Sequence, residues 1–167
     1  MIISHKHKFI FIKTRKTAGT SIEISLSRYC GDQDIITPIS PKDEKIRKKL
    51  GKQPQHYHKL YNHMRAQQIK KFVGEEIWKD YYTFCFDRIY TINDQVCVDK
   101  VGRFEHLQED LAEICDTIGL PFDGWLPNAK SDYRKDKRPY RAYYTAEQRV
   151  LIEKQFAKEI ALFGYQF

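Results

Sequence analysis

The sequence predicts an α/β protein with a central parallel sheet. Three short, nearly continuous apolar segments lie among stretches that have helical periodicity. Apolar runs without polar alternation are typical of strands that are buried on both faces. Strands that alternate with helices favour a parallel sheet with helices against its faces. A chain of 167 residues suits one domain, so we expect a single domain over 1–167.

The first strand and helix are predicted within residues 8–31. Lys8–Lys13 reads Lys-Phe-Ile-Phe-Ile-Lys, which is the pattern of a buried strand. Thr14–Gly19 is a polar turn. A helix then opens at Thr20 or Ser21, and Gly31 is a suitable residue to end it.

Residues 32–60 are polar, with three prolines and a run of basic residues at Lys45–Lys52. This composition predicts a basic loop with room for one short helix. Two interpretations remain open, a mobile lid that faces the substrate and a surface loop without a function.

After residue 60 the sequence predicts two further strands and three helices. In chain order the predicted elements are a helix at Met64–Phe72, a strand at Tyr81–Phe86, a strand within Val98–Phe104, an amphipathic helix at Leu107–Ile118 and a final helix at Thr145–Ala157. Thr145 and Gln148 have the spacing of a capping box, which marks the start of the last helix.

Composition and charge exclude several classes of protein. The net charge of +7 fits either a solvated surface or an anionic partner. Neither zinc-finger spacing nor an aromatic RNA-binding signature is visible, so we expect no nucleic-acid partner. No apolar run approaches the roughly 20 residues of a membrane span, and the start lacks a signal-peptide pattern. We therefore expect a cytoplasmic protein without a membrane span.

The four cysteines, Cys30, Cys85, Cys97 and Cys115, have neither metal-ligand spacing nor the pattern of a disulfide framework. We expect reduced thiols and no metal site.

The segment with the strongest chemical signal joins the first strand to the first helix. Lys13–Ser21 reads Lys-Thr-Arg-Lys-Thr-Ala-Gly-Thr-Ser. Its small residues let the backbone approach an anion, and a helix N-terminus offers N–H groups and partial positive charge. The usual nucleoside-triphosphate loop differs, because its lysine follows the last glycine, whereas Lys16 precedes Gly19. A basic turn that merely caps a helix is the alternative.

This loop resembles the 5′-phosphosulfate-binding loop of sulfotransferases that use 3′-phosphoadenosine 5′-phosphosulfate (PAPS), the carbohydrate-type members above all. Three later segments resemble the same family in the same order. They are Tyr-Thr-Phe-Cys-Phe-Asp-Arg ending at Arg88, Val101–Asp110, and Pro127–Ser131 followed by Tyr140–Thr145. The resemblance implies a three-layer sandwich like the P-loop nucleotide-binding folds, with the ligand at the carboxyl ends of the strands.

The resemblance also implies a reaction and a set of site residues. The sulfuryl group would move from PAPS to a hydroxyl or amine of a carbohydrate-like acceptor, leaving adenosine 3′,5′-bisphosphate, without a metal. Lys16 would contact the leaving oxygen, and Arg88 the 3′-phosphate. The implied donor site consists of Arg15, Lys16, Thr17, Ala18, Gly19, Thr20, Ser21, Arg88, Lys130 and Ser131.

His63 is the candidate for the base that takes the acceptor's proton. It precedes the predicted helix at Met64–Phe72, and related carbohydrate sulfotransferases have a base histidine in a comparable segment. Histidine suits this role because its pKa lies near working pH. An ordinary helix-capping histidine is the alternative.

The family pattern breaks after Arg88. The expected Asn-Pro-x-Asp-Arg, a serine and a helix are replaced by Ile89–Asp94. Either residues that belong here are missing from the sequence, or the protein is truly shorter. We expect the first, because losing a helix would expose apolar sheet surface at about 25 cal/mol per Å².

Two functions therefore stand. The first is a PAPS-dependent sulfotransferase, and the second is a non-catalytic nucleotide- or glycan-binding protein descended from one. A small-molecule kinase is disfavoured, because the triphosphate loop is absent.

Overall fold

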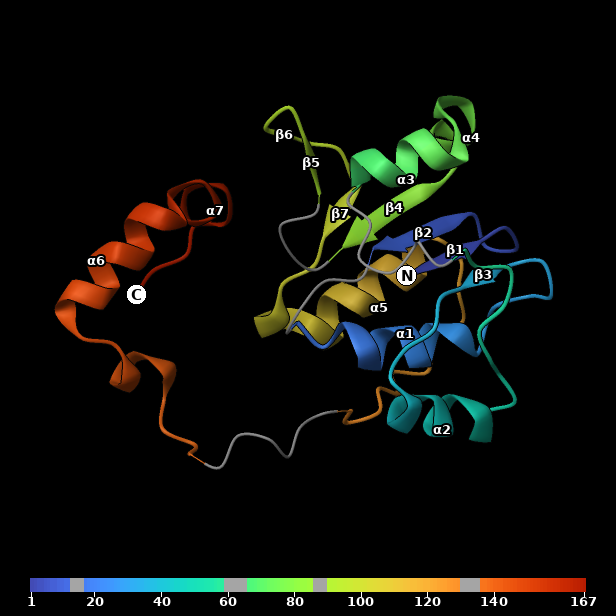
Figure 1. The fold of residues 1–167 in the computed structure, drawn as a ribbon, viewed down its shortest axis with the longest axis horizontal. Coiled ribbons are helices and arrows are strands. Elements are labelled where there is room, and N and C mark those ends of the chain that lie inside the picture. The colour runs from blue at the N-terminus through green and yellow to red at the C-terminus, as the bar shows by residue number, and fades with distance from the viewer. Residues whose placement is uncertain (13–16, 59–65, 86–89, 130–135) are drawn as a thin grey trace. The chain divides into compact units, whose positions relative to one another are not determined.

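The computed structural model of the protein describes residues 1–12, 17–58, 66–85, 90–129 and 136–167 (Figure 1). The chain divides into two compact units, Met1–Ala129 and Lys130–Phe167. The first unit contains the sheet and every buried residue of the described chain.

A five-stranded mixed sheet forms the centre of the first unit, in the order β3-β1-β2-β4-β7. The strands are β1 (Ile2–Ser4), β2 (Phe9–Ile12), β3 (Ile35–Ile36), β4 (Tyr82–Cys85) and β7 (Lys100–Val101). β2 pairs in parallel with β4, and β4 in parallel with β7. β1 pairs antiparallel with β2 and with β3. The prediction of an α/β protein is confirmed, but the parallel strands carry an antiparallel edge that was not predicted.

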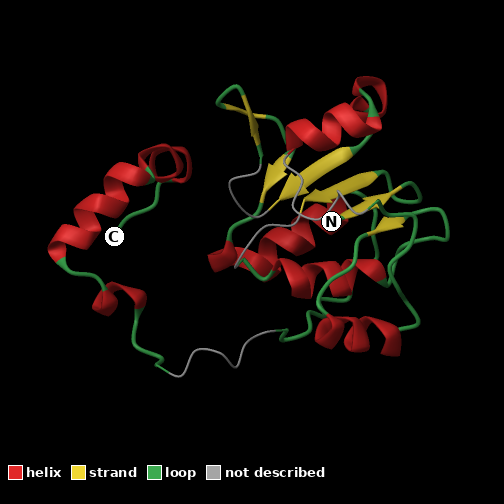
Figure 2. Cartoon of the chain, viewed as in Figure 1, coloured by secondary structure: helices red, strands yellow, loops and turns green. Residues whose placement is uncertain are grey.

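Helices lie on both sides of this sheet (Figures 1 and 2). They are α1 (Gly19–Ser27), α2 (Pro41–Lys49), α3 (Ala66–Val73), α4 (Glu75–Lys79) and α5 (Leu107–Thr117), with a 3₁₀ turn, η2 (Phe104–His106), before α5. α1 and α5 run along one face, and α3 and α4 lie on the other side. The predicted strand at Lys8–Lys13 and helix at Leu107–Ile118 are thus confirmed as β2 and α5.

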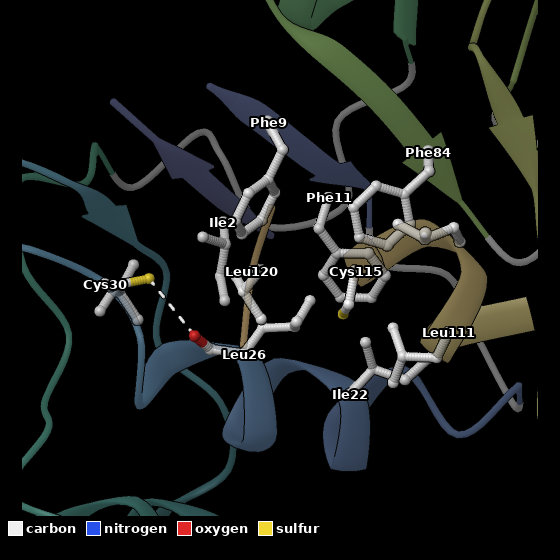
Figure 3. Close-up of a cluster of buried hydrophobic side chains, with 12 residues drawn as sticks. Ile2, Phe9, Phe11, Ile22, Leu26, Cys30, Phe84, Leu111, Cys115 and Leu120 are labelled. Atoms are coloured by element: carbon white, nitrogen blue, oxygen red, sulfur yellow. Dashed lines mark hydrogen bonds between the residues drawn. The ribbon is translucent and has the colours of Figure 1, made fainter. Parts of the chain in front are cut away.

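The hydrophobic core lies between the sheet and the pair α1 and α5 (Figure 3). Phe9, Phe11 and Phe84 point from β2 and β4 into this layer and are at most 1% exposed. Alternate residues of a strand face opposite sides, so Ile10 and Ile12 face the other side, and both are equally buried. Burial on both faces explains why β2 reads as an uninterrupted apolar run.

Residues 32–58, the described part of the predicted basic loop, contain more secondary structure than the sequence predicts. They contain β3 and α2, which begins after Ser40 with Pro41 at its first position. The fully buried guanidinium of Arg47 donates to the carbonyl of Thr37 at 3.1 Å and to Glu44 at 2.9 Å, and lies 3.5 Å from Glu23 of α1. The described part of this segment, up to residue 58, therefore contains packed secondary structure, and its role as a lid stays a prediction.

The connection between β4 and β7 is short. Its described part, residues 90–99, forms the hairpin of β5 (Thr91–Ile92) and β6 (Gln95–Val96) and contains no helix. α3 contacts β5. The expectation that residues are missing after Arg88 stays a prediction.

The second unit contains a 3₁₀ turn at Tyr140–Tyr143, followed by α6 (Ala146–Gln155) and α7 (Ala157–Phe163). The predicted capping box is confirmed, because Thr145 and Gln148 bond reciprocally. The predicted helix ends earlier than Ala157, at a break at Phe156. In the described part of the chain, no helix is long and apolar enough to cross a membrane.

Three of the cysteines, Cys30, Cys97 and Cys115, are free thiols, as predicted. Burial raises the pKa of Cys30 and of Cys115 to about 12, so neither forms a reactive thiolate at neutral pH.

Asp34 ties the turn between β1 and β2 to the end of α1. Its carboxylate accepts hydrogen bonds from the Ser4 hydroxyl at 2.7 Å and from the backbone N–H groups of His5, Lys6 and Gly31 at 2.7, 3.1 and 2.9 Å. Burial alone would raise the pKa of Asp34, but these four hydrogen bonds together hold it below its usual value.

Replacing Asp34 with Asn should therefore lower stability in a pH-dependent way. The amide nitrogen cannot accept, so we expect the free energy of unfolding to fall by about 2 kcal/mol at pH 7. A depressed carboxyl pKa stabilises above the unfolded value of about 3.9, and this contribution is lost as pH falls through the folded value. Urea unfolding from pH 7 to pH 3 should show the difference between the two proteins shrinking below about pH 4. A difference that stays constant over this range would contradict the account, and the exposed Asp32→Asn is the control.

Candidate anion site at the carboxyl edge of the sheet

The candidate site lies where the parallel strands end. Ile12 at the end of β2 pairs with Cys85 at the end of β4, so the two carboxyl ends lie side by side. The loop with Lys16 continues from β2, and Arg88 follows β4 by three residues. The register therefore starts both predicted phosphate-contacting segments from neighbouring points on one edge of the sheet.

α1 begins at this edge with an unusual first turn. Ala18 precedes the helix in the left-handed conformation, with φ of 56° and ψ of 9°, and its carbonyl accepts from the N–H groups of Ser21 and Ile22 at 2.8 and 3.2 Å. No acidic residue lies in the first turn. No carboxylate within this turn therefore neutralises the partial positive charge at the N-terminus of α1.

α5 starts at the same edge, because it follows the parallel strand β7, but its N-terminus differs. Glu109 and Asp110 lie in its first turn, and Asp110 accepts from the Arg103 N–H at 2.6 Å. These carboxylates would repel an anion at the N-terminus of α5. Of the two helix N-termini, α1 is the better anion site.

Thr20 and Ser21 are nearly buried, at 8% and 6% exposure. The Ser21 hydroxyl accepts a hydrogen bond from the backbone N–H of Ala129 at 3.3 Å, across 108 residues of sequence. The described parts of two segments that resemble the sulfotransferase family, residues 17–21 and 127–129, therefore meet at the start of α1. Ala129 was not among the predicted site residues, since its contribution comes from the backbone and leaves no side-chain signal.

The predicted site residues fall into two groups, those within the described part of the chain and those outside it. Thr17, Ala18, Gly19, Thr20 and Ser21 lie at the α1 N-terminus. Arg15, Lys16, His63, Arg88, Lys130 and Ser131 lie outside the described residues, and their roles stay predictions.

Comparison with known proteins found no matching family model, no matching curated protein and no matching solved structure.

The strained conformation of Ala18 gives a direct test of this local geometry. A left-handed conformation costs a residue with a Cβ about 1–2 kcal/mol, and glycine avoids this cost but loses more chain entropy on folding. Ala18→Gly should therefore raise the free energy of unfolding by about 0.5–1 kcal/mol in urea unfolding. The matched control is Ala112→Gly inside α5, which should lower it by about 1 kcal/mol. Destabilisation by both changes would show that Ala18 does not hold this conformation.

Proposed function

We propose that this chain is a sulfotransferase that moves the sulfuryl group of PAPS to a hydroxyl or amine of a carbohydrate-like acceptor. The observation that carries the proposal is the contact of residues 127–129 with residues 17–21 at the N-terminus of α1, whose first turn contains no acidic residue. The α/β architecture supports it, and we include in the proposal a P-loop-like three-layer sandwich. The ligand would lie at the carboxyl edge of β2 and β4.

The start of α1 would hold the 5′-phosphate of the donor. Backbone N–H groups from Thr17 to Thr20 and the hydroxyls of Thr20 and Ser21 are donors suited to phosphate oxygens. A guanidinium fork at Arg88 would bind the 3′-phosphate, and Lys130 and Ser131 would close over the nucleotide.

Transfer requires one bond to break and one to form at sulfur. The bond from sulfur to the bridging oxygen of the 5′-phosphate breaks, and the acceptor oxygen or nitrogen forms the new bond. Lys16 would stabilise the charge that develops on the leaving oxygen, and His63 would take the acceptor's proton. Catalysis would come mainly from positioning and charge, as in phosphoryl transfer.

One observation favours a second function, a non-catalytic nucleotide- or glycan-binding protein. The β4–β7 connection is where the family pattern places a serine and a helix, and residues 90–99 form a hairpin instead. A shortened connection removes part of the donor site and of the acceptor wall. This alternative predicts nucleotide or glycan binding without sulfate transfer from labelled PAPS to any acceptor.

Calorimetric titration with adenosine 3′,5′-bisphosphate tests the donor site directly. We expect binding that Lys16→Ala and Arg88→Ala together weaken by about a hundredfold, because each removes a charge-assisted hydrogen bond. Adenosine 5′-monophosphate lacks the 3′-phosphate, so Arg88→Ala alone should leave its weaker binding unchanged.

The control variant for this titration is Lys42→Ala, an exposed lysine of α2 that should leave both affinities unchanged. Absence of bisphosphate binding, or binding that the double variant leaves unchanged, would refute the donor site. Binding without transfer from labelled PAPS would select the second function.

A further inference from the structure

Three polar residues form a stripe along one side of α1. Ser21, Ser25 and Arg28 are spaced by four and three residues, which places them on the same side of a helix. Ile22 and Leu26 face the sheet instead and belong to the hydrophobic core. The polar stripe therefore faces away from the sheet.

Residues 121–129, which we call the α1-binding segment, contact all three residues of this stripe. At the C-terminal end of α1, Arg28 forms a bidentate ion pair with Asp123 at 2.5 and 2.8 Å. In the middle, the Ser25 hydroxyl donates to the Trp125 carbonyl at 2.6 Å. At the N-terminal end, the Ala129 N–H reaches Ser21. The segment therefore runs antiparallel to α1 and ends at the candidate anion site.

Aromatic and apolar contacts strengthen this attachment. The Arg28 guanidinium lies over the Trp125 ring at 4.7 Å and over the Tyr29 ring at 5.1 Å. Phe122 and Leu126 pack against the hydrophobic core. The attachment thus combines the ion pair, a buried hydroxyl and two apolar side chains over a few residues.

The contact at Ser21 has a consequence for the direction of its hydroxyl proton. A serine hydroxyl has one proton to donate and lone pairs to accept with. Because the Ala129 N–H occupies a lone pair, the proton remains available for an acceptor at the N-terminus of α1. Ser21 is 6% exposed, so its hydroxyl has little access to water as an alternative acceptor.

We propose that the α1-binding segment is a positioning element of the anion site, which sets Ser21 as a donor to the ligand through the Ala129 N–H. Arg28 and Asp123 act at a distance, by holding the segment in register along α1. This proposal rests on the proposed function, because the ligand is the phosphate end of the nucleotide. It adds residues outside the loop that determine affinity without contacting the ligand.

A double-mutant cycle on Asp123 and Ser21 tests the proposal, with adenosine 3′,5′-bisphosphate titrated into the full chain. Asp123→Asn should weaken binding about fivefold and Ser21→Ala about tenfold. Because both changes remove the same hydroxyl interaction, the double variant should lose about tenfold and not about fiftyfold. Exchanging the charges, with Arg28→Asp and Asp123→Arg together, should restore most of the affinity lost in Asp123→Asn.

Glu75→Gln is the matched control, since Glu75 forms a comparable surface ion pair with Lys70 at 2.7 Å on other elements. It should leave the affinity unchanged. Additive losses in the cycle, or no loss for Asp123→Asn while the unchanged chain binds the bisphosphate, would overturn the positioning role and leave the proposed function standing. Absence of binding by the unchanged chain would overturn both.

Discussion

The parallel pairing of β2 with β4 is the constraint on which the rest of the first unit depends. It joins residues more than 70 positions apart, and its register from Phe9 with Tyr82 to Ile12 with Cys85 fixes where both strands end. Phe9, Phe11 and Phe84 then face the layer formed by α1 and α5, where their burial supplies much of the hydrophobic stabilisation. A shift by one residue would turn these rings to the opposite face.

The position of α1 follows from this pairing. The loop after β2 must return the chain against the sheet, so α1 starts at the carboxyl edge and its whole length is buried. Its core side packs on the strands, and its polar stripe accepts the segment that contains Asp123 and Ala129. An anion site at the start of α1 would therefore be built by two distant parts of the chain, residues 17–21 and residues 121–129.

Sequence reasoning found the elements that have a strong periodic signal. The apolar run of β2 and the capping box of α6 were both located from local pattern, since each follows from short-range physics. The antiparallel strand β1 was missed, because two isoleucines and a serine beside a charged turn give little signal. The basic composition of residues 32–60 predicts a loop with room for one short helix, which α2 fills, but only the structure reveals that Arg47 is buried against Glu23 and Glu44.

The candidate site was predictable only in part. Small residues before a helix mark the loop, but the contact of Ala129 with Ser21 is made by the backbone, which no residue pattern encodes. The most direct test of the central claim is two-dimensional amide NMR of the chain during titration with adenosine 3′,5′-bisphosphate. The account predicts the largest shifts at Gly19, Thr20, Ser21 and Ala129, with small shifts at Glu109 and Asp110 of α5. Large shifts at the α5 N-terminus with none at the start of α1 would contradict it.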